Sequence, residues 1–220
     1  EKRLALTLLA QRESYARALA EAIEDGLVPA RDLDTSLARQ LRLWNDPHIN
    51  ETLATHWGLA RESSASAAQE IASWKSRLTP ERIAAADPQN GSKVFAQSCA
   101  SCHTLFDQGN DIGPELTGSN RSDLDYLLAN IVDPNAVIGQ DYLLTIVQTK
   151  DGRSAAGIVK RDTPASLTLA NQAETVTYAR SDIKSVERLE VSLMPPGLLN
   201  AHSESEVADL VAYLRSQASQ

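Results

Sequence analysis

The sequence predicts a mainly α protein, α+β overall, in which a small five-stranded β unit is nested among helices. Apolar residues recur at helical spacing through residues 1–86 and again near the C-terminus. Residues 141–190 instead contain short β-branched segments separated by turn residues. We therefore expect a helical region at 1–86, a helical core built from 87–140 and 191–220, and a β insert at 141–190.

The helical region at 1–86 is expected to hold several short helices. A first apolar stripe ends at Gly26 and consists of Leu4, Leu8, Tyr15, Leu19 and Ile23. A second stripe consists of Leu33, Leu37, Leu41 and Trp44. Pro47 suits the first turn of a third helix, and further helices are expected from about Ser64 to Leu78 and from Thr79. Short paired helices are typical of the end of a HEAT-like repeat array, and a simple helical cap is the alternative.

The helical core is expected to consist of three helices and a loop. The first begins at Asp87-Pro88 and continues through Phe95, and the second covers about Ser122–Val132. A loop containing Gly and Pro, residues 109–118, separates them. The last helix, about Ser203–Gln217, is amphipathic.

The insert is expected to contain five strands. They are residues 143–149, 157–161, 166–170, 175–179 and 183–189. Asp151-Gly152 is a strong hairpin signal between the first two. Short strands at intervals of roughly ten residues are typical of a small barrel or sandwich.

Composition excludes some partners. The formal net charge is -8, whereas a nucleic-acid-binding protein would show a basic stripe. An acidic balance is compatible with docking onto a basic protein surface, although it could simply aid solubility. No apolar run approaches the about 20 residues of a transmembrane helix, so we expect no membrane span in this segment.

The chemistry of the chain is carried by Cys99-Ala-Ser-Cys102-His103, which contains both cysteines. Two thiols at this spacing can each add to a vinyl group of one haem, and the adjacent histidine can ligate the iron; this is the c-type attachment pattern. A zinc site would need two more ligands, and the other histidines show no paired spacing. A dithiol redox motif would prefer a thioredoxin-like βαβ setting, whereas the flanks here are helical. Zinc, dithiol chemistry and a chance match remain the alternatives.

The flanks of the motif resemble class I cytochromes c. Gly91-Ser-Lys-Val-Phe95 is similar to the family's N-terminal helix, and Leu210-Val-Ala-Tyr-Leu214 to its C-terminal helix. Gly113-Pro114 is similar to the loop in which a proline carbonyl accepts the N–H of the proximal imidazole. The resemblance implies the cytochrome c fold, with one covalent haem c at Cys99 and Cys102, and His103 as iron ligand.

Met194, the only methionine, lies in Leu-Met-Pro-Pro-Gly just ahead of the last helix. This resembles the methionine loop of the family and implies Met194 as the sixth ligand. Core gap-filling is the ordinary role of a lone methionine, and His202 is the competing ligand. Thioether ligation raises the reduction potential relative to bis-histidine ligation.

The chain departs from the family in the long stretch between His103 and Met194, where the β insert lies. Together with the N-terminal helices, this resembles the C-terminal part of large planctomycete-type haem-binding proteins, in which helical repeats precede a cytochrome c unit. That resemblance implies a larger protein, with an upstream enzyme domain as one arrangement.

Further residues are expected at the haem. The apolar candidates are Phe95, Phe106, Leu116, Leu127 and Ile131, each of which could equally be plain core. Asn120, Arg121 and Tyr142 could hydrogen-bond propionates, or simply lie at the surface.

The function expected from the resemblance is one-electron transfer between redox partner proteins, without a catalytic site in this chain. Covalent haem attachment in the family implies a periplasmic or other extracytoplasmic location. A haem-based sensor with a labile Met194 and a partner-recruiting interaction domain are the alternatives. The β insert is expected to be separable from the helical core. It is expected to cover a haem edge or to dock a partner or a second copy through an exposed strand edge, and shielding of the methionine loop from solvent is the alternative.

Overall fold

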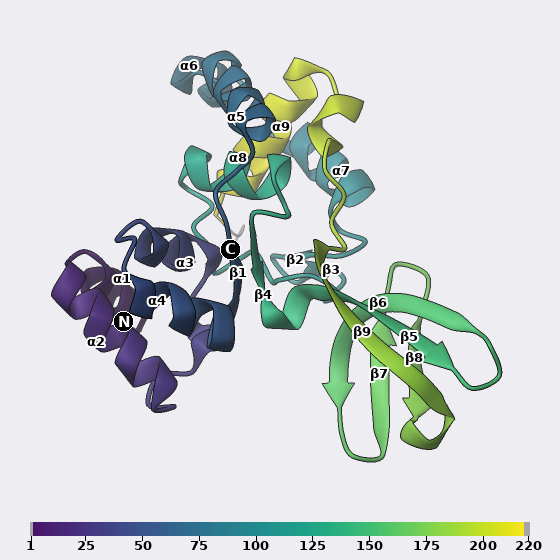
Figure 1. Cartoon of the computed structure of the whole chain (residues 1–220). Helices are drawn as coiled ribbons and strands as arrows, with labels where there is room; N and C mark the ends of the chain where they lie inside the picture. Colours follow the sequence, from purple (N-terminus) through teal and green to yellow (C-terminus); the bar gives the residue numbers. More distant parts are fainter. Residues whose placement is uncertain (1, 218–220) are drawn as a thin grey trace. The chain divides into compact units, whose positions relative to one another are not determined.

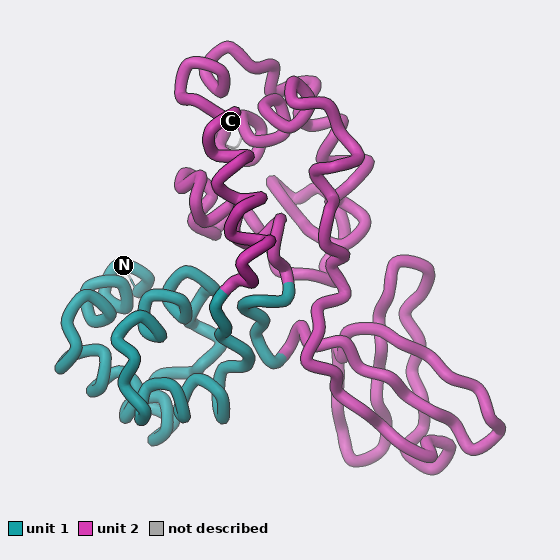
Figure 2. Tube along the Cα trace, turned by 45° about the horizontal axis from the view of Figure 1, so that its top comes forward, with its two compact units in different colours: residues 1–62, 135–140 teal, residues 63–134, 141–220 magenta. Residues whose placement is uncertain are grey.

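The computed structural model describes residues 2–217 and divides the chain into two compact units. Unit 1 comprises residues 1–62 and 135–140, and unit 2 comprises residues 63–134 and 141–220 (Figure 2). This division differs from the expected one in three places. Residues 141–190 do not form a unit of their own but belong to the same unit as the helical core. Residues 63–86 belong to the unit with the cysteine motif, and residues 135–140 return to the N-terminal unit.

Unit 1 is a small helical body closed by a two-stranded ladder. Its main helices are α1 (Lys2–Ala10), α2 (Glu13–Glu24), α3 (Thr35–Arg42) and α4 (Pro47–Thr52), with the 3-10 turn η1 (Ala30–Asp32) and the π-helical turn η2 (Leu53–Trp57). The side chains of Asp34 and Asp46 accept hydrogen bonds from backbone N–H groups of α3 and α4, which fixes where these helices begin. Strand β1 (Gly58–Ala60) pairs antiparallel with β4 (Val137–Gly139).

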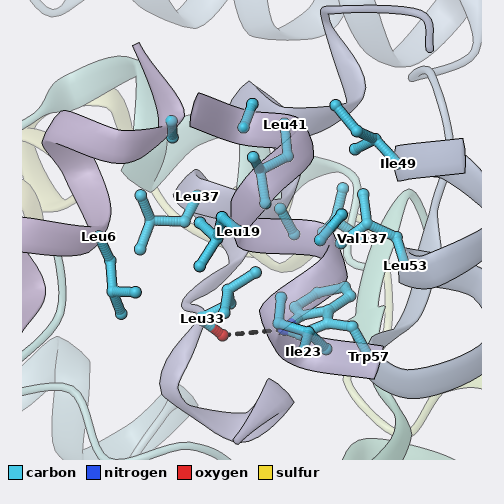
Figure 3. Packing of buried hydrophobic residues seen from close by; sticks show 14 of the residues in the cluster. Leu6, Leu19, Ile23, Leu33, Leu37, Leu41, Ile49, Leu53, Trp57 and Val137 are labelled. Atoms are coloured by element: carbon cyan, nitrogen blue, oxygen red, sulfur yellow. Dashed lines mark hydrogen bonds between the residues drawn. The ribbon is translucent and has the colours of Figure 1, made fainter. Parts of the chain in front are cut away.

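The core of unit 1 is formed by apolar side chains on one face of each helix (Figure 3). Leu19, Leu37 and Ile49 are buried, and the indole N–H of Trp57 donates to the carbonyl of Leu33 at 2.9 Å. The expected first stripe is wrong at three of its five residues, because Leu4, Leu8 and Tyr15 are 65%, 55% and 47% exposed. The helix breaks between Ala10 and Glu13, and this changes the phase of the buried face. Leu6 and Ala10 are buried instead.

The helical part of unit 2 is organised around a close crossing of two helices, α7 (Pro88–Ser98) and α9 (Glu204–Arg215). Gly91 makes the crossing possible, since a Cβ there would overlap the carbonyl oxygen of Asp209 and lie 2.8 Å from Cβ of Tyr213. Ser203 begins α9 with a capping box to Glu206. Helix α8 (Leu124–Val132) completes the same apolar cluster.

Helices α5 (Ala65–Arg77) and α6 (Pro80–Ala84) pack on this group and explain why the unit begins near residue 63. Trp74 and Leu78 are buried in the cluster that contains α7 and α9. Lys75 pairs with Asp125 of α8 at 2.6 Å, and Arg82 pairs with Glu204 of α9 at 2.8 Å. The two helices expected in the N-terminal region therefore belong structurally to the motif-bearing unit.

The insert forms one antiparallel sheet, which within the described residues has five strands in the order β8-β7-β6-β5-β9 (Figure 1). The strands are β5 (Leu143–Thr149), β6 (Ser154–Asp162), β7 (Ser166–Ala170), β8 (Thr175–Ala179) and β9 (Ile183–Ser192). Each strand contributes to one apolar cluster, which includes Val147, Leu167, Val159, Tyr178 and Ile183. The sheet therefore curls around its own core, closer to the barrel alternative than to a sandwich of two sheets.

Candidate cofactor site

The cysteine motif lies where α7 ends. Cys99 is the C-terminal cap of α7, and the N–H groups of Cys102 and His103 both donate to its carbonyl, at 3.0 and 2.9 Å. This tight turn holds the two thiols and the imidazole in one short segment. Both cysteines are half-buried and have free thiols. Burial, with the neighbouring Cys102 thiol, raises the pKa of Cys99 to about 12, so Cys99 stays a neutral thiol.

The imidazole of His103 is oriented by the loop that follows it. Its Nδ1 lies 2.8 Å from the carbonyl oxygen of Pro114 and donates a proton to it. Gly113 lies flat against the ring, since a Cβ there would come within 2.7 Å of Cε1. Burial lowers the pKa of His103, although the hydrogen bond to Pro114 acts in the opposite direction. A neutral ring with Nδ1 occupied presents Nε2 as a metal ligand, which is the orientation of metal-binding histidines.

A two-residue hairpin supports the same loop. Strands β2 (Thr104–Leu105) and β3 (Gln108–Gly109) are joined by Phe106 and Asp107, whose φ angles are 52° and 61°. Positive φ at both central residues is the geometry of a type I′ turn, and it is strained for Phe. The turn presents the Phe106 ring to Tyr213 in an edge-on contact, with centroids 6.0 Å apart.

The five apolar candidates meet in one cluster that also contacts Cys99. Phe95 and Leu127 are buried, whereas the other three, Phe106, Leu116 and Ile131, are half-buried at its margin. Tyr213 of α9 joins them and packs on Phe95 with ring centroids 5.6 Å apart. The structure thus places an apolar, partly open surface beside the first cysteine.

Met194 lies in a short loop between β9 and the 3-10 turn η5 (Leu198–Ala201). Its N–H donates to Ser192 Oγ at 3.1 Å, and the chain turns at Gly197, where φ is 79°. Leu193 packs in the apolar cluster that contacts Cys102, and Leu199 is buried in the cluster that contacts Cys99. The methionine loop therefore joins two clusters, each of which contacts one of the cysteines.

The competing candidates have other partners. His202 Nε2 lies 2.8 Å from Ser98 Oγ, which links the end of η5 to α7. The side-chain amide of Asn120 donates a hydrogen bond to the carboxylate of Asp123 in the turn before α8, with Nδ2 3.4 Å from Oδ2. Arg121 donates to the carbonyls of Leu214 and Ser216 at the end of α9, an interaction unrelated to an anionic ligand. These contacts favour structural roles for the three side chains.

Tyr142 lies elsewhere, in the small cluster beside Cys102. Burial, together with the carboxylates of Asp141 and Asp111, raises the pKa of Tyr142. Its phenol therefore keeps the proton and remains a possible hydrogen-bond donor.

Sequence reasoning missed the part of the site that the β insert supplies. Ile158 of β6 and Ala170 of β7 are buried against Ile112 of the motif loop, and Cys102 packs at this cluster. The sequence predicts a separable insert, and the structure packs its sheet against the motif. The sequence pattern predicts the strands that contain Ile158 and Ala170. Nothing local in the sequence indicates that these two side chains contact the cysteine motif.

The donors fit a covalently held, planar, apolar group with a metal at its centre. Two free thiols, a neutral imidazole with Nε2 presented, and an apolar surface occur together, and a thioether side chain lies in an adjoining loop. Across residues 2–217, no three His, Cys, Asp or Glu side chains converge as a purely protein-bound metal site would require. None of the described helices is long and apolar enough to cross a membrane.

A comparison with protein families agrees with this geometry. The family model described as Cytochrome c matches residues 88–218 of the chain. The matched segment begins at α7, contains the cysteine motif, the β sheet and Met194, and includes the whole of α9.

Proposed function

Because the chain belongs to the cytochrome c family, we propose that it transfers single electrons through one haem c attached to Cys99 and Cys102, with His103 and Met194 as axial ligands. Members of this family are electron carriers rather than enzymes. The iron of such a group accepts and releases one electron, and the protein's own residues determine how easily it does so.

The observation that carries the proposal is the hydrogen bond from His103 Nδ1 to the Pro114 carbonyl. It fixes the tautomer, aims Nε2 away from the loop, and raises the basicity of the ring. Gly113 leaves room for the ring to lie flat against the backbone. A histidine held in this way beside two free thiols is poised to bind iron.

Met194 is proposed as the second axial ligand because its loop joins the clusters at both cysteines. The rival His202 is bonded to Ser98. The apolar residues around Cys99 would limit the access of water to the bound haem, and a low-dielectric surrounding disfavours the extra positive charge of ferric iron. Thioether ligation and apolar burial therefore both favour the reduced state.

The partners are proposed to be redox proteins with a basic docking surface, since the chain carries a net charge of -8. Cytochrome c domains typically occur outside the cytoplasm, and we place this one in the periplasm or an equivalent compartment. Its role would be an electron-accepting or relay domain of a larger redox protein.

Covalent attachment is tested first. Wild-type protein should retain haem after extraction with acidic acetone, and Cys99→Ala or Cys102→Ala should weaken that retention. His103→Ala should lose the low-spin absorption spectrum. Free release of haem from the wild-type chain would contradict the proposal.

The sixth ligand is tested with Met194→Ala, and His202→Ala serves as its matched control. The first variant should become high-spin or water-bound, bind CO readily when reduced, and show a lower potential. The second should keep the wild-type spectrum. Ready CO binding by the wild-type reduced protein would instead favour a ligand-binding sensor.

A further inference from the structure

The β sheet makes a polar contact with the second cysteine of the motif, and within residues 2–217 it makes none with the sulfur of the first. Gln172 lies just after β7, and its Nε2 donates to Cys102 Sγ at 3.5 Å. Ser101 Oγ, on the motif itself, lies 3.8 Å from the same sulfur. Cys99 packs among apolar side chains at its own cluster. The two sulfurs of the motif therefore lie in unlike surroundings.

The turn that carries Gln172 is fixed by its neighbour. Asn171 Oδ1 accepts hydrogen bonds from the N–H groups of Ala173 and Glu174, at 2.9 and 3.1 Å. Its Nδ2 donates to the carbonyl of Ala156 on β6, at 3.1 Å. These bonds anchor the backbone at residue 172 to the sheet, so the amide reaches Cys102 from a rigid base.

The sheet also contacts the loop that follows the motif. Lys160 of β6 donates to the carbonyl oxygen of Asp111, and its ammonium lies 3.6 Å from the Asp111 carboxylate. The next residue, Ile112, is buried against Ile158 and Ala170. The N–H of Gly113, which lies against the His103 ring, donates to the carbonyl of Cys102 at 2.7 Å. The sheet thus contacts the Cys102 segment through apolar packing and two polar links.

We propose that Gln172 is a positioning residue of the haem site, donating its side-chain amide to the thioether sulfur of Cys102, and that Ile158 and Ala170 make the sheet one wall of this site. The inference rests on the proposed function, because it requires covalent haem at Cys102. A thioether sulfur remains a hydrogen-bond acceptor after the thiol has reacted. A donor at that sulfur withdraws electron density from the attached group, which favours the reduced iron and raises the potential.

The reduction potential of the intact holoprotein tests the donor. Gln172→Leu removes the amide, and we expect its midpoint potential to lie below that of wild type. Gln172→Lys restores an N–H donor, and we expect its potential to be at or above the wild-type value. Gln97→Leu and Gln97→Lys are matched controls on an exposed position of α7. The first control should leave the potential unchanged, and the second measures the effect of charge alone.

Two outcomes of this series would overturn the inference. One is a Gln172→Leu variant with the wild-type potential. The other is a midpoint potential that falls in both Gln172→Leu and Gln172→Lys, once the effect of charge measured with the Gln97 variants has been subtracted. Loss of packing alone would lower the potential in both variants. A potential that is lowered by Leu and restored by Lys at position 172 supports a hydrogen-bond donor at this position.

A second measurement uses the unmutated protein and does not depend on the folding of any variant. In NMR spectra of the reduced, diamagnetic form, the side-chain amide of Gln172 should be displaced by the haem ring current, whereas that of Gln97 should lie at its ordinary position. An undisplaced Gln172 amide would refute the contact. Haem retention on a denaturing gel separates the two proposals: retained haem with no effect at Gln172 rejects only the present inference, while released haem rejects the proposed function.

Discussion

The guanidinium of Arg121 lies over the ring of Phe106, with its central carbon 4.9 Å from the ring centroid. The same guanidinium donates to the carbonyl of Ser216 at 2.9 Å and to that of Leu214, where α9 ends. Its Nε and Nη2 donate to the Thr117 carbonyl at 3.2 and 3.0 Å. One side chain thus joins the end of α9 to the loop that follows His103, and its positive charge complements the negative end of the helix dipole.

Replacing Arg121 with Met should therefore destabilise the protein. Loss of charged hydrogen bonds to carbonyl groups at the end of α9 costs about 2 kcal/mol in the free energy of unfolding. Denaturant unfolding followed by circular dichroism measures the change. Arg121→Lys keeps the charge but not the fork of donors, and we expect it to recover less than half of the loss. A variant as stable as wild type would show that the contacts contribute nothing net.

Gly91→Ala should separate α7 from α9. The added Cβ would overlap the Asp209 carbonyl and crowd Tyr213, and no flexible side-chain end can move aside. We expect a loss of about 3 kcal/mol in unfolding free energy, measured by thermal or denaturant unfolding. Gly118→Ala is the matched control, because the nearest atom to its Cβ would be 3.9 Å away, on the Glu115 carboxylate. Equal losses in both variants would contradict the close crossing.

Gly113→Ala should change the axial ligand rather than the global stability. Its Cβ would come within 2.7 Å of Cε1 of His103 and push the imidazole away from the loop. We expect a weakened or high-spin iron signal in absorption and electron paramagnetic resonance spectra of the holoprotein. Secondary structure, measured by circular dichroism, should stay unchanged. An unaltered low-spin spectrum would show that the ring can shift without losing the metal.

The β5–β6 hairpin should respond to acid through Asp151. Hydrogen bonds from Arg153 and Thr149 lower the pKa of Asp151 to about 2. Its carboxylate therefore stabilises the turn above the ordinary pKa of an aspartate, and this contribution is lost as the pH falls from about 4 toward 2. Hydrogen exchange of the hairpin amides should quicken over that range. Asp151→Asn should remove this pH dependence, and an identical profile in both proteins would contradict the assignment.

Most helices and strands could be predicted from the sequence because the patterns that indicate them involve residues close together in the chain. The strands of the insert are present near the expected positions, and Pro47 begins α4 as expected. The break at residues 11–12 carries no Pro or Gly, so spacing alone extended the first stripe across it. The β1–β4 ladder joins two three-residue strands far apart in the chain, and such short strands have no readable period.

The candidate site also combines local sequence patterns with contacts between segments that are far apart in the chain. The cysteine motif, Pro114 and the methionine loop are contiguous patterns that the sequence displays directly. Gln172, Ile158 and Ala170 reach the motif only through the register of the curled sheet. Asn120, Arg121 and His202 look available in the sequence, and only their partners in the fold show that they are engaged.

The pairing of β1 with β4 has a consequence for folding during synthesis and for recombination of the gene. Ala136 and Val137, which help complete the core of unit 1, are synthesised only after α8, and the N–H of Arg61 donates to the Ala136 carbonyl at 2.7 Å. Unit 1 therefore cannot close its core on the ribosome until β4 has emerged. A gene fragment ending at residue 62 would lack β4, and one beginning at residue 63 would carry β4 without its partner strand. No single recombination point separates the two units, because residues 63–134 of unit 2 lie between the two segments of unit 1 in the sequence.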